Sequence, residues 1–274
     1  MAVSISMADI SKLRTMTGAG MMDCKNALGE AEGDFEKAIE IIRKKGQAIA
    51  AKRSDREASE GCVLAAAKDG FAAIVALKCE TDFVAKNADF IALTQKILDE
   101  IMAKKPHSLD EVNALIIDGR TVAELVTERS GITGEKMEVD FYEYVEGATV
   151  VEYIHPGNKL ATIVAFGENG VERQIARDIA MQAAAMNPVS LDRNSVPEKI
   201  IAQELEIGRE KAREEGKPEA MLDKIAQGRL DKFFKDSTLL EQAFIKDSKI
   251  AVADYLKANK ATVTAFRRIT LNQE

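Results

Sequence analysis

Apolar residues recur at helical spacing at the start of the chain and predict two short helices. Ile10 and Leu13 mark the first helix, and Met21, Cys24 and Leu28 follow one another at intervals of three and four residues in the second. The sequence T-G-A-G lies between them, and its glycines permit a tight, left-handed turn. We therefore expect the first helix to stop at this corner.

A third helix is predicted to begin after Asp34, whose side chain can cap it. Phe35 and Ala38 start an apolar stripe along one of its faces, and Gly46 is expected to close it. The small and polar residues 47–60 that follow are expected to form a linker.

After this linker the hydrophobic pattern changes from helical to extended. The runs GCVLAAAK and FAAIVALKCE lie on either side of a K-D-G turn at residues 68–70 and predict a β-hairpin. A helix is expected from Asn87 until Pro106 ends it, with shorter helices near 108–117 and 121–130. The segment KMEVDFYEYVEG that follows them is strand-like.

The hairpin pattern occurs twice. AAIVAL at 72–77 corresponds to ATIVAF at 161–166, and an E-G pair precedes each hairpin. The second hairpin has the longer turn, HPGNK at 155–159, and a helix follows each copy. The chain therefore predicts an α+β fold with two related subdomains, each a small antiparallel sheet backed by helices.

A highly charged segment lies between the second subdomain's helix at 171–186 and the C-terminal region. From Glu198 to Lys217, 11 of 20 residues are charged, and a G-K-P turn then reverses the chain. Apolar or small residues recur at intervals of three and four, which predicts an antiparallel coiled-coil hairpin. The predicted seam consists of Ile201, Leu205, Gly208 and Ala212 on one helix and Met221, Ile225 and Gly228 on the other.

The end of the sequence predicts a helix at 249–258 and a strand, ATVTAFRRIT, after it.

Composition narrows the class of protein. The 274 residues are 46% hydrophobic and 30% charged, which is ordinary for a globular chain, and 45 acidic against 38 basic residues give a net charge of -7. This acidic balance disfavours direct binding to nucleic acid. Three cysteines without a C-x-x-C pair do not indicate a disulfide scaffold.

No apolar run reaches membrane-span length and the N-terminus does not resemble a signal peptide, so we expect a cytoplasmic protein without membrane contact.

Patterns typical of enzymes are missing from the sequence. It has two histidines, no H-E-x-x-H, no paired-cysteine metal spacing and no recognisable Ser/His/Asp pattern, and T-G-A-G lacks the G-K-[ST] ending of a phosphate loop. We therefore expect neither a bound metal nor a cofactor, and favour a binding module over an enzyme. Acid–base catalysis stays an alternative, because it needs only two carboxylates.

One loop differs between the two subdomains. Glu80-Thr81-Asp82-Phe83-Val84 lies where a strand turns into a helix, whereas the second copy has the turn G-E-N-G. In one interpretation, Asp82 caps the helix and Phe83 packs into the core. Alternatively, the loop presents an aromatic wedge beside a carboxylate to a partner. Periodicity does not choose between these interpretations.

Several motifs resemble the bacterial elongation factor Ts family, in family order along nearly the whole chain. The most specific are LRTMTGAGMMDCKNAL at 13–28 and KCETDFVAKN at 78–87. Tyr153-x-His155, DIAMQAAAMNP, GRLDKFF and LLEQAFIKD support them. The resemblance implies a guanine-nucleotide exchange factor that acts on the GTPase elongation factor Tu and is not itself an enzyme.

The resemblance also implies a domain organisation. The fold class is then α+β, with a three-helix N-terminal domain of ubiquitin-associated (UBA-like) type, a core of two related subdomains and an inserted antiparallel coiled-coil hairpin. The corresponding boundaries are 1–55 for the GTPase-docking domain, 56–140 for the core N-subdomain, 141–193 with 237–274 for the core C-subdomain, and 194–236 for the hairpin.

Functional residues are implied by position in the matching motifs. The loop of Thr81, Asp82, Phe83 and Val84 would intrude beside the partner's magnesium and phosphate site. Partner-binding residues would be Arg14, Thr17, Gly18, Ala19, Gly20, Met21 and His155. Two alternatives remain open: T-G-A-G can simply connect helices, and His155 can pack locally beside its turn.

The chain departs from the family pattern at three places. Ala243 stands where the family has proline, Pro156-Gly157-Asn158 replaces a glycine-rich turn, and Arg268-Ile269 replaces Arg-Phe in the last strand. Contacts of the C-terminal helical module of longer members are not assumed here. Two rival classes are weighed against this family. A nucleic-acid-binding translation protein needs a basic, aromatic-laced face, and the acidic balance counts against it. A ubiquitin-type adaptor could be argued from the three-helix N-terminus alone, but it leaves the loop and the repeat unexplained.

Overall fold

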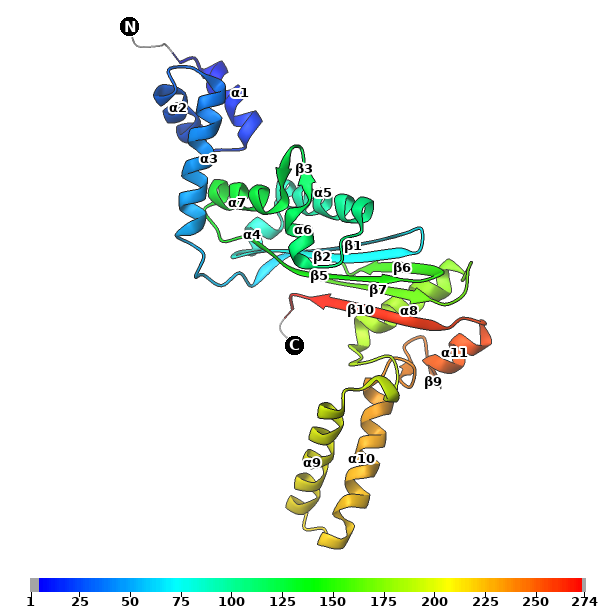
Figure 1. Cartoon of the computed structure of the whole chain (residues 1–274). Helices are drawn as coiled ribbons and strands as arrows, with labels where there is room; N and C mark the ends of the chain where they lie inside the picture. The colour runs from blue at the N-terminus through cyan, green and yellow to red at the C-terminus, as the bar shows by residue number, and fades with distance from the viewer. Residues whose placement is uncertain (1–4, 273–274) are drawn as a thin grey trace. The chain divides into compact units, whose positions relative to one another are not determined.

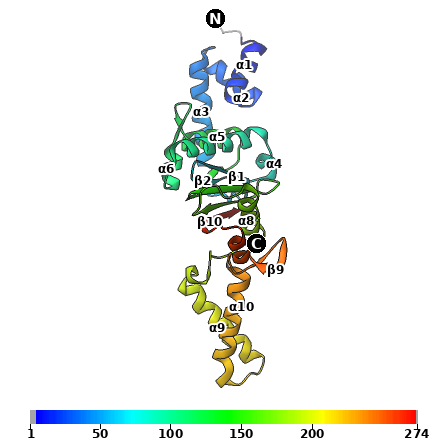
Figure 2. The ribbon, with the colours of Figure 1, turned by 90° about the vertical axis from the view of Figure 1, so that its right-hand side faces the viewer.

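The computed structural model describes residues 5–272 (Figure 1 and Figure 2). The chain forms two compact units. Within the described part, unit 1 contains residues 5–64 and 75–142, and unit 2 contains Ala65–Ile74 and Glu143–Asn272. The fold combines helices with small antiparallel sheets and begins with three helices, which confirms the predicted α+β class. In the described residues, no helix is both long and apolar enough to cross a bilayer.

Unit 1 begins with α1 (Met7–Thr17), α2 (Met21–Glu30) and α3 (Phe35–Ala51), the three predicted helices. Ser6 and Asp9 form a capping box at α1, and the Asp34 carboxylate accepts hydrogen bonds from two amides at the start of α3. Their apolar faces close a small core of their own, centred on Leu13, Cys24 and Leu28. Local caps and periodicity thus predict where these helices begin.

The prediction that Gly46 ends the third helix was wrong. α3 continues to Ala51, and only residues 52–59 connect it to the first strand. Gly46 lies instead where α3 crosses α7 (Val122–Thr133): a Cβ built on Gly46 would be 3.5 Å from the Cα of Gly131. The glycine therefore allows two helices to approach closely and does not mark the end of a helix.

The first hairpin forms as predicted from β1 (Glu60–Lys68) and β2 (Phe71–Cys79). Asp69 and Gly70 connect them with φ values of 50° and 76°, the left-handed conformation that a two-residue hairpin turn requires. β5 (Glu138–Glu146) completes a sheet in the order β1-β2-β5, so that the repeated motif of β2 is the central strand.

Helices connect β2 to β5. They are α4 (Asp82–Ala85), α5 (Ala88–Lys104), α6 (Leu109–Ala114) and α7. α5 starts where the sequence predicts it, and Asn87 is its N-cap. The helix predicted at 108–117 ends earlier, at Ala114, because β3 (Ile116–Ile117) and β4 (Arg120–Thr121) pair around a left-handed turn.

Unit 2 repeats the three-stranded arrangement. β6 (Thr149–Ile154), β7 (Leu160–Phe166) and β10 (Val263–Thr270) pair antiparallel in the order β10-β7-β6, so the second copy of the motif is again the central strand. α8 (Arg173–Met186) packs on β6 and β7 and closes the core of this unit (Figure 1). The internal repeat therefore corresponds to a repeated sheet.

The charged segment forms an antiparallel pair of helices, α9 (Glu198–Glu214) and α10 (Leu222–Ser237), side by side in both views (Figure 1 and Figure 2). Short 3-10 turns, η1 (Arg193–Ser195) and η2 (Glu219–Met221), precede them. The α9 seam was predicted correctly, but the observed α10 seam is displaced from the predicted one by one residue at its start and by two at Leu230. The buried residues of α10 are Leu222, Ala226, Leu230 and Phe234.

The size of Ala226 explains this displacement. A Cβ built on Gly208 would be 3.0 Å from the Cα of Ala226, so two small residues meet where the helices are closest. Met221, which the pattern placed in the seam, is 47% exposed.

The C-terminal helix is shorter than predicted. β8 (Ala243–Phe244) and β9 (Asp247–Ala251) form a small hairpin, and α11 (Val252–Ala258) begins after it, so the first three residues of the predicted helix at 249–258 are a strand. Asn158, in the turn that departs from the family pattern, has the expected left-handed backbone with a φ of 54°.

Candidate functional site

The T-G-A-G corner, Thr17 to Gly20, is held by local hydrogen bonds. Gly18 has a φ of 71° and caps α1, donating its N–H to the carbonyl of Arg14 at 2.7 Å. The hydroxyl of Thr17, which is buried, donates to the Leu13 carbonyl at 2.8 Å and accepts from the Ala19 amide at 3.3 Å. The corner is therefore a fixed connector, and its use for docking stays a prediction.

Two exposed methionines flank this corner in the sequence. Arg14 and Gly20 are exposed, whereas Met21 is half-buried against the three-helix core. The side chains of Met16 and Met22 are 55% and 64% exposed. Sequence reasoning did not place these two methionines at the site. Both lie off the apolar stripe of their helices, and a large apolar residue outside such a stripe is the signal that indicates exposure.

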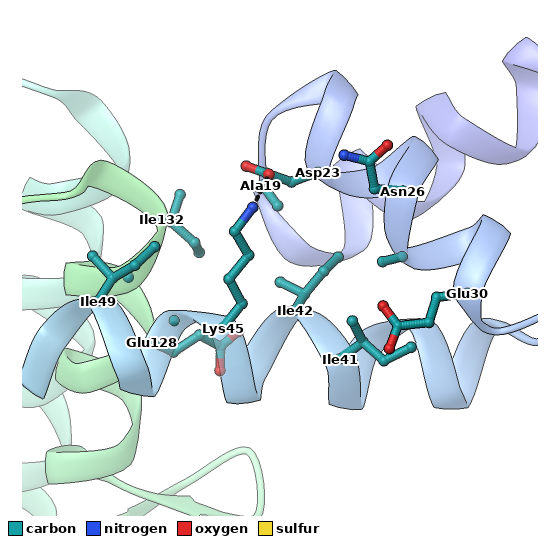
Figure 3. Close-up of a pocket in the computed structure, with 13 residues that line it drawn as sticks. Ala19, Asp23, Asn26, Glu30, Ile41, Ile42, Lys45, Ile49, Glu128 and Ile132 are labelled. Carbon is teal, nitrogen blue, oxygen red and sulfur yellow. Dashed lines mark hydrogen bonds and ion pairs between the residues drawn. The ribbon is translucent and has the colours of Figure 1, made fainter.

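A pocket adjoins the corner, between α2, α3 and α7 of unit 1 (Figure 3). Its cavity of about 140 Å³ is lined by isoleucines, and the Lys45 ammonium contacts the Asp23 carboxylate at 2.5 Å beside it (Figure 3). This volume is well below the ~300 Å³ at which ligand pockets usually begin, so it does not suit a nucleotide. The lining residues are Ala19, Asp23, Asn26, Ala27, Glu30, Ile41, Ile42, Lys45, Gly46, Ile49, Glu128, Gly131 and Ile132.

In the loop after β2, Phe83 points away from the core. It lies in the four-residue helix α4, and its side chain is 84% exposed. Thr81, not Asp82, is the N-cap: its hydroxyl accepts from the Val84 amide at 3.4 Å. The interpretation in which Asp82 caps the helix and Phe83 packs inward was therefore wrong.

The start of this loop is fixed by Glu135, which follows α7. The Glu135 carboxylate accepts hydrogen bonds from the amides of Glu80 and Thr81 at 3.1 and 3.0 Å, and from the Thr81 hydroxyl at 2.6 Å. Sequence reasoning missed Glu135 because it lies 54 residues from Thr81 in the chain. No local pattern relates the two.

Glu80 makes the reciprocal contact. Its carboxylate accepts from the Lys136 amide at 2.6 Å and pairs with Arg56 and Arg53 at 3.1 and 3.3 Å. Burial alone would raise the pKa of Glu80, but the Lys136 amide and the two guanidinium groups outweigh it and hold that pKa below its ordinary value. The carboxylate is thus ionised and joins the end of α3 to the loop.

Cys79 lies directly before this loop and is buried. Burial raises the pKa of its thiol to about 12, and the nearby Glu135 carboxylate adds to the effect. A thiol that stays protonated is a poor nucleophile. Cys79 is therefore a packing residue, and its Sγ–H donates to the Thr81 carbonyl at 3.3 Å.

The carboxylate of Asp82 lies on the surface of α4. It pairs with the Lys86 ammonium at 2.6 Å, one helical turn away, and this hydrogen bond raises the pKa of Lys86. Both side chains are substantially exposed, so solvent screens the pair and it contributes little to stability.

Arg129 of α7 relates the corner to the loop region. A Cβ built on Gly18 would be 3.5 Å from an Arg129 nitrogen, and Arg129 Nη2 donates to the side chains of Asn87 and Asp89 at 3.3 and 3.1 Å. Those two residues start α5, directly after α4. One guanidinium therefore lies between the corner and the segment that follows the loop.

His155 belongs to unit 2, at the end of β6. Its ring is exposed, and its Nδ1 is 2.9 Å from the Tyr153 hydroxyl, while the guanidinium of Arg177 lies over the Tyr153 ring at 5.5 Å. The side chain is oriented by this neighbour and still reaches solvent. Both earlier interpretations of His155, partner contact and local packing, stay open on this geometry.

These features are the exposed groups that a binding surface would use. Within residues 5–272 no group of three or more metal-ligating side chains is close enough to hold an ion. Unit 1 presents an aromatic ring and a carboxylate on the short helix α4, whose N-cap is held by Glu135. It also presents two exposed methionines beside the T-G-A-G corner.

Comparisons with known proteins agree on one family. A family model described as Elongation factor TS matches residues 80–273. The chain is 62% identical to the elongation factor Ts of Porphyromonas gingivalis over 275 residues and 58% identical to that of Azobacteroides pseudotrichonymphae over 274 residues. It is 46% identical to the elongation factor Ts of Bacteroides fragilis over 331 residues. Each comparison covers 99% of this chain and 100% of the relative.

Proposed function

This chain belongs to the elongation factor Ts family, and on that premise we propose that it binds GDP-bound elongation factor Tu in the cytoplasm and promotes release of GDP. The Thr81–Val84 loop disturbs the magnesium and phosphate site of the GTPase, and GTP then rebinds. The protein acts as an exchange factor and catalyses no covalent reaction of its own.

The exposed side chain of Phe83 is the observation that carries this proposal. A phenylalanine that is 84% exposed has lost little of its hydrophobic surface to its own fold. It therefore gains free energy when a partner's pocket covers it, as aromatic anchors at protein interfaces do. Inserted beside a nucleotide site, the ring separates side chains that pack there in the absence of the factor.

Asp82 supplies the electrostatic part of the mechanism. In the free chain its carboxylate pairs with Lys86 in an exposed, weak ion pair. Next to a magnesium site, the same carboxylate would accept hydrogen bonds from the water molecules that coordinate the ion and so disturb its ligand shell. Magnesium tolerates such a change poorly because it requires nearly ideal octahedral coordination. Loss of the ion leaves the phosphate charge of GDP uncompensated and weakens GDP binding.

Exchange then follows from thermodynamic coupling. If the factor binds the nucleotide-free GTPase more tightly than the GDP-bound form, GDP must weaken the factor's binding by the same ratio. The factor needs no acid or base for this, only contacts whose geometry conflicts with bound nucleotide and magnesium.

Other residues of the site provide docking in this proposal. Arg14 and the T-G-A-G corner, with Met21 beside it, bind the GTPase domain, and the exposed Met16 and Met22 add apolar side chains to this contact. His155 makes a separate contact from unit 2. These contacts set the affinity, whereas the loop sets the rate of GDP release.

Stopped-flow release of a fluorescent GDP analogue tests the proposal. The analogue is loaded on elongation factor Tu from the same organism and chased at several magnesium concentrations, with and without this protein. We expect a saturable acceleration that is largest at high magnesium, where spontaneous release is slowest. No acceleration from a folded, nucleotide-loaded partner would contradict the proposed function.

A pair of phenylalanine variants assigns the effect to the loop. Phe83→Ala should reduce the release rate at saturating factor by about tenfold or more while half-saturation changes less, since the wedge acts after docking. Phe141→Ala is the matched control, because Phe141 is another exposed ring of unit 1, on β5. An unchanged rate at saturation for Phe83→Ala would contradict the role of this residue.

A further inference from the structure

We propose that Glu135 is a positioning residue for nucleotide exchange: its carboxylate fixes the start of α4 and thereby the direction in which Phe83 is presented. This inference rests on the proposed function, because it names the residue that orients the intruding loop. It adds a role for a side chain outside the loop, on the connection between α7 and β5.

The carboxylate of Glu135 makes three hydrogen bonds to two consecutive residues. Oε2 accepts the amides of Glu80 and Thr81 at 3.1 and 3.0 Å, and Oε1 accepts the Thr81 hydroxyl at 2.6 Å. Hydrogen bonds to an ionised acceptor are about twice as strong as neutral ones. They act at the N-cap of α4, since Thr81 is the residue whose hydroxyl also accepts the Val84 amide.

The backbone of Glu135 is itself held by a hydrogen bond from a buried residue of α7. Gly134 ends α7 with a φ of 72° and turns the chain back. The Ser130 side chain, only 2% exposed as a residue, donates its hydroxyl to the Glu135 carbonyl at 2.5 Å. The Glu135 amide donates to the Thr133 hydroxyl at 3.3 Å. The carboxylate is therefore attached to the end of α7 rather than to a free loop.

A second contact runs in the opposite direction. The Lys136 amide donates to the Glu80 carboxylate at 2.6 Å. Each of the two connections thus contributes a carboxylate that accepts an amide of the other. This reciprocal arrangement leaves the segment before Asp82 little freedom to rotate.

α4 depends on such support because it is very short. Four residues form a single turn, and a single turn has almost no intrinsic helical stability in water. Its direction therefore depends on tertiary contacts, which are the buried Ala85 at its end and the hydrogen bonds of Glu135 at its N-cap. A ring presented in one orientation loses less conformational freedom on docking than a ring on a mobile loop. Holding the start of α4 therefore favours insertion of the Phe83 ring.

Three variants test the inference. Glu135→Ala removes all three hydrogen bonds, whereas Glu135→Gln keeps the side-chain length and an acceptor oxygen. Glu124→Ala is the matched control: Glu124 accepts the Thr121 amide at 2.8 Å and the Thr121 hydroxyl at 3.1 Å, the same kinds of bond at the start of α7. Circular dichroism and melting curves verify that each variant is folded.

Hydrogen exchange of the free protein is the first measurement. The amides of Ala85 and Lys86 donate to the carbonyls of Thr81 and Asp82, both at 3.1 Å, so they report opening of α4. In Glu135→Ala we expect them to exchange about tenfold faster, because at least one charge-assisted hydrogen bond is lost from the closed state. In Glu124→Ala they should be unchanged.

Kinetics with the GTPase are the second measurement. We expect Glu135→Ala to lower the rate of GDP release at saturating factor by about tenfold and to leave the half-saturating concentration within about twofold, which separates positioning from docking. Glu135→Gln should recover most of both effects. The inference is overturned if α4 protection is unchanged in Glu135→Ala, if only half-saturation changes, or if Glu135→Gln loses the rate while keeping full protection.

The two measurements separate this inference from the proposed function. If the wild-type protein does not accelerate GDP release, the proposed function fails, and hydrogen exchange still decides whether Glu135 holds α4. If the wild-type protein accelerates release and Glu135→Ala behaves like Glu124→Ala in both measurements, the proposed function stands and the positioning role is wrong.

Discussion

Gly46 of α3 and Gly131 of α7 lie backbone to backbone. A Cβ built on Gly131 would overlap the main chain of Gly46, and a Cβ on Gly46 would be 3.5 Å from the Cα of Gly131. The two helices can cross at this distance only because neither residue has a side chain. This crossing joins the three-helix region to the part of unit 1 that contains the Thr81–Val84 loop.

We expect Gly131→Ala to destabilise the protein by about 3 kcal/mol, because the added methyl group must separate the two helices. The measurement is the shift of the denaturant midpoint. Gly228→Ala is the control: Gly228 lies within α10, and an added Cβ would have no neighbour within 4 Å. That variant should gain about 1 kcal/mol from higher helix propensity. Equal effects of the two substitutions would refute the close crossing.

Phe83→Ala should leave stability within about 0.5 kcal/mol of the wild type, since the ring is 84% exposed. Phe90→Ala, on the next helix, should cost about 3–5 kcal/mol, because Phe90 is fully buried. Thermal unfolding of both variants provides the comparison. A large loss of stability in Phe83→Ala would mean that the ring packs into its own chain.

Glu80 should contribute to stability at neutral pH and lose that contribution in acid. Burial favours the neutral form, but the Lys136 amide and the Arg56 and Arg53 guanidinium groups prevail, so the folded protein holds the pKa of Glu80 below the ordinary value of 4.5. A group with a lowered pKa in the folded state stabilises the fold above its unfolded pKa, and this contribution disappears as the pH falls through the folded value.

Comparison of the wild type with Glu80→Gln tests this dependence. The wild type should be the more stable protein at pH 6, and the difference in unfolding free energy should shrink steadily below about pH 4.5. A difference that stays constant down to pH 3 would exclude the ionised Glu80 carboxylate as its source.

Tyr255 is expected to titrate late. Burial raises the pKa of its hydroxyl to about 12, and the hydrogen bond that it donates to the Asp178 carboxylate at 3.0 Å adds to the shift. Because this pKa lies above the ordinary value of 10, the neutral hydroxyl stabilises the fold below pH 10, and the contribution is lost as the pH rises toward 12.

Near-ultraviolet absorbance of tyrosinate measures this titration among the four tyrosines of the chain. Tyr255→Phe should remove the absorbance step near pH 12 and leave the steps of the other tyrosines in place. The unfolding free energy of this variant should also depend less on pH in the alkaline range. Persistence of that step in the variant would assign it to another tyrosine.

Local features of this chain could be predicted from the sequence. The Asp34 and Asn87 caps, the Asp69-Gly70 turn and the left-handed Asn158 all follow from interactions within a few residues. The repeated strand motif also predicted two related sheets, and both copies are central strands. The motifs that resemble elongation factor Ts identified the family, which the comparisons confirm.

The tertiary structure alone decided the features that depend on distant residues. Gly46 has the local pattern of a helix end, yet it faces a glycine of another helix. The seam of α10 contains Ala226 rather than the larger neighbour Ile225, because Gly208 of α9 lies opposite Ala226. The exposure of Phe83 and the support from Glu135 likewise depend on a contact between two connections more than 50 residues apart. Periodicity records which face of an element is apolar, but which residue of another element meets that face is fixed only when the chain packs.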